Sequence, residues 1–116
     1  MLERKTEENI FQWNNMEIKF LIERYSNNNE LAIEVLYFEE EYKGFMPYAT
    51  LSVCIPGFPL LPNQVLVKLW SENKSFSNFT ELFPQFFTDL DFEVPSGFVS
   101  ANLWEISEEF LSLESK

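Results

Sequence analysis

Apolar and polar residues alternate along three stretches of the N-terminal half, as they do in half-buried β-strands. The stretches cover residues 16–22, 31–38 and 47–55. The asparagine-rich segment 26–30 predicts a hairpin between the first two, because asparagine tolerates the positive φ angles of tight turns. The second stretch is apolar on both faces, so we expect that strand to lie toward the middle of a sheet.

The hydrophobic period changes in the second half of the chain. Residues 56–63 contain three prolines and predict an irregular crossover, and residues 64–70 predict a fourth strand. After Ser77, a candidate N-cap, apolar residues recur at intervals of three and four, which indicates an amphipathic helix with an aromatic stripe against the sheet. The stripe consists of Phe79, Leu82, Phe83, Phe86 and Phe87. Pro84 lies within this segment, so we expect the helix to be short, to be kinked, or to begin further along the chain.

The C-terminal third returns to alternation. Residues 88–97 predict an acidic loop or irregular strand, residues 98–105 predict a fifth strand, and Ser107 can cap a short final helix. Residues 1–9 show no period and are expected to form a flexible tail, with residues 10–116 as a single domain. The predicted fold class is α+β: a mostly antiparallel sheet of about five strands, one main helix packed on a face, and a short C-terminal helix.

The composition excludes several kinds of catalytic site. The 116 residues include no histidine, which removes the Ser-His and Cys-His nucleophile pairs and most zinc sites. The three glycines are scattered and form no phosphate-binding loop. Cys54 lies in an apolar stretch without a neighbouring cation, which favours a packed and inert thiol. We therefore expect no enzymatic activity and no cofactor.

The sequence also indicates where the protein works. No stretch approaches 18 consecutive apolar residues, and the first residues lack the pattern of a signal peptide. A single cysteine forms no internal disulfide, which is unusual for a small protein of an oxidising compartment. These features predict a cytoplasmic protein that does not associate with membranes.

Charge is the most informative feature of the sequence. The net charge is −11, and residues 75–115 contain eight carboxylates but no lysine or arginine. Such a surface repels nucleic acid and favours a basic protein partner, whose Lys- and Arg-lined groove it can fill by imitating phosphates. The candidate contact residues are Asp89, Asp91, Glu93, Glu105, Glu108 and Glu109. Trp70, Trp104 or Phe98 could act as anchors where exposed. A purely solubilising acidic surface is the simpler alternative.

Three of these carboxylates have a spacing that is compatible with a cation site. Asp89, Asp91 and Glu93 are spaced two apart, which in an extended segment aims them the same way and could hold calcium or magnesium. The segment lacks the glycine and the distant bidentate glutamate of a standard calcium loop. A solvated acidic edge is therefore favoured, and no metal site is predicted.

Three turn and strand segments are distinctive: residues 24–33, 47–53 and 96–98, together with Leu60, Leu61, Asn63 and Asn73. These segments resemble the family catalogued as domain of unknown function 4313. The resemblance covers about residues 16–108. It implies a small bacterial or phage protein, often carried on mobile elements, with no activity to transfer residue by residue.

Charge and resemblance together predict a phage-type inhibitor that binds the basic surface of a host defence nuclease, such as a CRISPR effector, in the bacterial cytoplasm. This inhibitor would be anti-CRISPR-like and would act as a nucleic-acid mimic. The alternative is a non-enzymatic interaction or assembly protein of a mobile element. It could be a homodimer through an uncovered sheet edge or the proline-rich loop, because twenty aromatic residues are many for so small a domain to bury.

Overall fold

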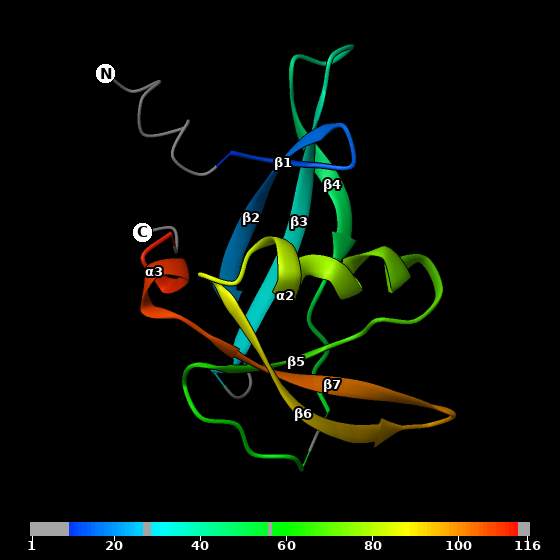
Figure 1. Ribbon diagram of the computed structural model, residues 1–116, viewed down its shortest axis with the longest axis vertical. Helices are drawn as coiled ribbons and strands as arrows, with labels where there is room; N and C mark the ends of the chain where they lie inside the picture. The colour runs from blue at the N-terminus through cyan, green and yellow to red at the C-terminus, as the bar shows by residue number, and fades with distance from the viewer. Residues whose placement is uncertain (1–9, 27–28, 56, 114–116) are drawn as a thin grey trace.

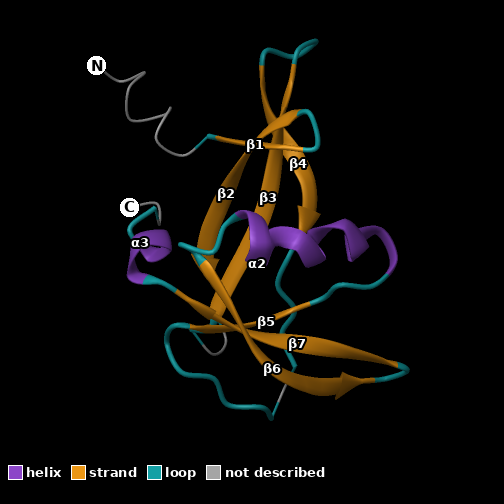
Figure 2. Ribbon diagram, in the orientation of Figure 1, coloured by secondary structure: helices purple, strands orange, loops and turns teal. Residues whose placement is uncertain are grey.

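The computed structural model describes residues 10–26, 29–55 and 57–113, and these form two antiparallel sheets with short helices between them (Figure 1, Figure 2). The prediction of an α+β fold with mostly antiparallel strands is confirmed. The predicted number of about five strands in one sheet is wrong, because the described residues contain seven strands in two sheets. The predicted tail, residues 1–9, lies outside the described residues.

The first sheet holds four strands in chain order, β1-β2-β3-β4. They are β1 (Phe11–Trp13), β2 (Met16–Arg24), β3 (Leu31–Glu39) and β4 (Gly44–Thr50). The predicted hairpin joins β2 to β3, with Asn29 at a φ of 63° and residues 27–28 outside the described part. β3 pairs on both sides, as its two apolar faces predicted.

The chain leaves the first sheet at Leu51 and joins the second. The Leu51 N–H donates to the Ile33 carbonyl at 2.9 Å, while the Leu51 carbonyl accepts from the Lys68 N–H at 3.1 Å. From Val53 the backbone bonds to Leu66 instead of β3. The third predicted strand therefore ends at Thr50 and not at residue 55, because its hydrogen-bond partner changes.

The second sheet has the order β5-β7-β6, and all of its strands are antiparallel. Its members are β5 (Gln64–Val67), β6 (Phe87–Ser96) and β7 (Val99–Ile106). The predicted fourth strand is thus shorter than expected, and the acidic segment is a strand. The predicted short C-terminal helix is confirmed as α3 (Glu108–Leu111), with Ser107 Oγ accepting from the Phe110 N–H at 3.1 Å.

The prediction of one main helix over the Phe-rich segment is wrong. A 3₁₀ helix, η1 (Ser71–Asn78), leads into the single turn α2 (Phe79–Leu82). Helical conformation ends at Phe83, whose φ of −126° and ψ of 58° lie outside the α region. Phe83 precedes Pro84, and the proline ring disfavours the α conformation of the residue before it.

The aromatic stripe is nevertheless buried without a regular helix to present it. Phe79, Phe83, Phe86 and Phe87 are buried, whereas Leu82 is 50% exposed. The centroid of the Phe20 ring of β2 lies within 6.5 Å of the centroids of all four buried rings, in each case in an edge-to-face arrangement. The prediction that these residues pack on the sheet holds for the four phenylalanines, since burial of aromatic area does not require helical periodicity.

Two apolar clusters lie on opposite faces of the second sheet. Val65 and Val67 of β5 belong to the main cluster, which also contains the inner face of the first sheet. Leu66 between them belongs to a smaller cluster with Val94 and Ala101, because alternate residues of a strand face opposite ways. The smaller cluster holds β6 against β7.

Candidate protein-binding surface

The acidic segment, residues 88–97, makes up most of strand β6, and its Asp89 and Glu93 lie opposite the part of β7 that also pairs with β5. β7 lies between the other two strands, so β6 is an edge strand. β5 pairs only as far as Asn102 of β7, whereas the pairing of β6 with β7 continues to Ser96 and Val99. The end of the hairpin is therefore two-stranded, and Figure 1 shows its turn projecting away from α2 and α3.

A bulge interrupts β6 in the middle of the acidic segment. Asp89 pairs with Trp104 and Glu93 pairs with Asn102, so three residues of β6 lie opposite the single residue between those partners. Asp91 adopts a φ of 59°, and its N–H donates to Asp89 Oδ1 at 2.8 Å. Bulges and charges of this kind protect an edge strand from pairing with another chain.

All six predicted contact carboxylates are exposed, but the structure does not bring them into one strip. Directly paired residues share a face of a sheet, so Asp89 and Glu93 lie on the face of Trp104 and Asn102. Glu105 pairs with Thr88 and lies on the opposite face. Glu108 and Glu109 occupy the first turn of α3, where negative charge suits the helix start.

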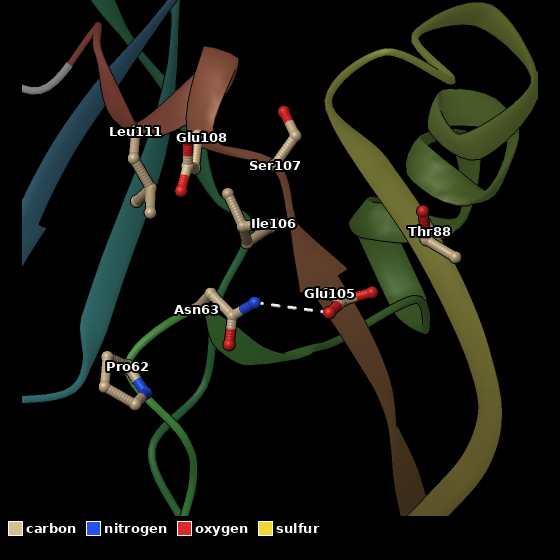
Figure 3. A pocket seen from close by; sticks show the side chains of 8 residues that line it. All are labelled: Pro62, Asn63, Thr88, Glu105, Ile106, Ser107, Glu108 and Leu111. Carbon is tan, nitrogen blue, oxygen red and sulfur yellow. Dashed lines mark hydrogen bonds between the residues drawn. The ribbon is translucent and has the colours of Figure 1, made fainter.

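Glu105 and Glu108 line one open hollow of about 460 Å³ between β7, α3 and the chain before β5 (Figure 3). The Asn63 side-chain amide donates to Glu105 Oε2 at 3.2 Å, and the Asn63 carbonyl accepts from the Ile106 N–H at 2.7 Å. These bonds hold one of the two carboxylates in place. Such a hollow could accept a guanidinium or ammonium group from a partner.

The geometry that a cation site at Asp89, Asp91 and Glu93 would need does not form. The bulge and the left-handed Asp91 break the alternation that would aim the three carboxylates the same way. In the part of the chain that the structure describes, no three His, Cys, Asp or Glu residues gather in a way that could hold a metal ion. Cys54 is half-buried.

The three predicted aromatic anchors differ in exposure. Trp104 is 1% exposed and packs in the core against Phe87, with ring centroids 5.3 Å apart. Trp70 is half-buried against the smaller apolar cluster. Phe98, in the turn of the hairpin, is fully exposed. Of the three candidates, only Phe98 is free to meet a partner.

Sequence reasoning missed Phe92. This side chain is 51% exposed in the β6 bulge, and its ring is stacked on Phe58 with centroids 6.2 Å apart. An aromatic residue between two acidic residues was a visible signal, but alternation alone would have placed it on the buried face of a regular strand.

No family model, no curated protein and no solved structure matches this chain. The resemblance noted in the sequence therefore stays a prediction. None of the helices in the described part of the chain has the length and apolar character to span a bilayer.

Proposed function

We propose that this protein is a non-enzymatic binding protein that attaches to a basic protein surface through the β6–β7 hairpin and the start of α3. The observation that carries the proposal is the exposure of all six candidate carboxylates, which lie on two faces of the hairpin and at the start of α3. They belong to a stretch, residues 75–115, that contains no lysine or arginine. The residues of this stretch attract a basic surface and supply no cation of their own that would repel it.

The partner class that fits best is a host protein that handles nucleic acid, and a CRISPR effector or another nuclease is the leading case. Such proteins carry Lys- and Arg-lined grooves that bind phosphates, and exposed carboxylates can compete for those side chains. The sequence resemblance to a family often carried on mobile elements supports an inhibitor of host defence. In this proposal the protein acts as a nucleic-acid mimic in the bacterial cytoplasm and does not bind nucleic acid itself.

The test is capture of the partner followed by an activity assay. The tagged protein should retain a basic nucleic-acid-binding protein from bacterial lysate at about 0.05 M salt and release it at about 1 M, because the Debye length shrinks over that range. Double-stranded DNA should compete for the captured protein, and nuclease activity should fall when the acidic protein is added. Capture that DNA does not compete with, together with unchanged nuclease activity, would contradict the proposal.

A second candidate function is assembly through the outer face of the first sheet. Leu36 and Phe38 of β3 alternate with the buried Val35 and so lie on the face away from the main cluster. On this face the ring centroids of Phe38 and Phe45 lie 5.5 Å apart, and Lys19 Nζ lies 4.7 Å from the ring centroid of Phe45. A homodimer formed by this face would be seen by light scattering and would persist at high salt, unlike an electrostatic complex.

A further inference from the structure

Phenylalanine exposure is confined to one element of the molecule. All thirteen phenylalanines lie in the described residues, and eleven of them are buried or half-buried. The two exposed ones, Phe92 and Phe98, both belong to the β6–β7 hairpin. Single exposed apolar residues need no explanation, but the hairpin that carries the acidic segment also carries both of the exposed phenylalanines.

The hairpin turn does not require a phenylalanine. Ser96 pairs with Val99, so Gly97 and Phe98 form a two-residue turn. Gly97 has a φ of 69° and supplies the left-handed conformation that such turns need at the first position, whereas Phe98 is not among the residues with positive φ. The second position accepts a small polar residue equally well, and a fully exposed ring adds little to the stability of the fold.

The hairpin holds Phe98 in a defined place. The last three pairs, from Val94 with Ala101 to Ser96 with Val99, continue the ladder to the turn. Val94 and Ala101 are buried in the smaller apolar cluster, which fixes the base of this two-stranded end. A backbone that is already ordered before binding loses little conformational entropy when the complex forms.

The charges carried by the same hairpin define the chemistry of the surface that Phe98 can meet. Asp89, Asp91 and Glu93 are exposed on the same hairpin, which carries no cation. Nucleic acid, an anionic membrane and a second copy of a chain with a net charge of −11 would all be repelled. A basic protein surface that also contains an apolar socket satisfies both the carboxylates and the ring.

We propose that Phe98 is the anchor of the interface and inserts into an apolar socket within the basic surface of the partner protein. This inference rests on the proposed function and adds a site to it. Aromatic side chains that fill a pocket at the centre of an interface commonly dominate its affinity, while surrounding charges set orientation and association rate.

Affinity for the captured protein tests the anchor directly. Phe98→Ser should weaken binding about 10- to 100-fold, the loss expected when a buried phenylalanine side chain is removed. The salt dependence of the affinity should be the same for this variant and the unmodified protein, because the substitution changes no charge. The matched control is Tyr42→Ser in the β3–β4 turn, which removes another exposed aromatic residue, 69% exposed, and should leave affinity unchanged. Equal affinity of Phe98→Ser and the unmodified protein overturns the anchor.

Photo-crosslinking in cells separates failure of the anchor from failure of the proposed function. The photoreactive residue p-benzoylphenylalanine replaces Phe98 in one variant and Asp91 in another. Cross-links from position 98 to a lysine- or arginine-rich segment of another protein are expected. Cross-links from position 91 alone would overturn the anchor and leave the proposed function standing. No cross-link from either position overturns both, and a cross-link from position 98 to a second copy overturns the anchor.

Discussion

Neutralising the acidic segment of β6 should abolish most of the binding without unfolding the protein. The variant combines Asp89→Asn, Asp91→Asn and Glu93→Gln. The choice of amides follows from the bulge, where Asp89 Oδ1 accepts from the Asp91 N–H at 2.8 Å and Asp91 has a φ of 59°. Asparagine keeps that acceptor oxygen and tolerates the left-handed conformation.

The expected loss of affinity follows from the placement of the charges. Asp89 and Glu93 share a face of the hairpin, so both can meet one partner groove. Close interfacial charge pairs couple at roughly 1.5 kcal/mol or more each. Two such pairs amount to about 3 kcal/mol, which is about a hundredfold in the dissociation constant.

Charge reversal with three lysines should carry an additional cost to the fold. Lysine at position 89 removes the acceptor for the Asp91 N–H, a loss of about 1 kcal/mol. Lysine at position 91 is less tolerant of a positive φ than aspartate, at roughly another 1 kcal/mol. The free energy of unfolding from urea titration should therefore fall by about 2 kcal/mol for the lysine variant and by less than about 0.5 kcal/mol for the amide variant.

The assay is titration of the captured partner by calorimetry at low and high salt. A matched control carries Glu17→Gln, Glu40→Gln and Glu41→Gln, three exposed carboxylates of the first sheet and its β3–β4 turn. Both variants change the net charge from −11 to −8, so only position distinguishes them. Equal weakening by the two variants would show that total charge matters and not this segment. Unchanged affinity of the β6 variant would place the interface elsewhere.

Three further predictions concern the fold. Ser52→Ala should lower the free energy of unfolding by about 1–3 kcal/mol in urea, because the buried Ser52 Oγ accepts from the Ile33 N–H at 2.9 Å. Ser107→Ala should lower it by about 1 kcal/mol through loss of the α3 cap, and Ser107→Asn should restore most of that. A hydrogen bond with Glu39, together with burial, raises the pKa of Tyr37 above 10.0. The unfolded chain therefore releases this proton first as pH rises, so stability should fall as the pH rises through 10.0 and above, and less so in Tyr37→Phe.

Features that depend only on neighbours along the chain were predictable from the sequence. Alternation over residues 16–22 and 31–38, with asparagines between, predicted the β2–β3 hairpin, because side-chain period and turn chemistry are local. Ser107 before two glutamates predicted the cap of α3 for the same reason. The acidic character of residues 75–115 follows directly from their composition.

Tertiary contacts decided where those elements went. Leu51 ends the first sheet and begins the link to the second because its backbone bonds to both Ile33 and Lys68, partners distant in sequence. The Phe-rich segment kept its burial but lost its helix, since Pro84 opposes the helical conformation while the core still accepts the rings.

The candidate surface was likewise decided in three dimensions. The charge distribution along the sequence predicted six contact carboxylates. The register of β6 against β7 places Asp89 and Glu93 on one face of the sheet and Glu105 on the other. The sequence did not distinguish Trp104 from Phe98 as a candidate anchor. In the structure Trp104 is buried in the core, whereas Phe98 is exposed in the hairpin turn. Burial is a property of what surrounds a residue, and for these two side chains the surroundings come from strands that the sequence pattern does not pair.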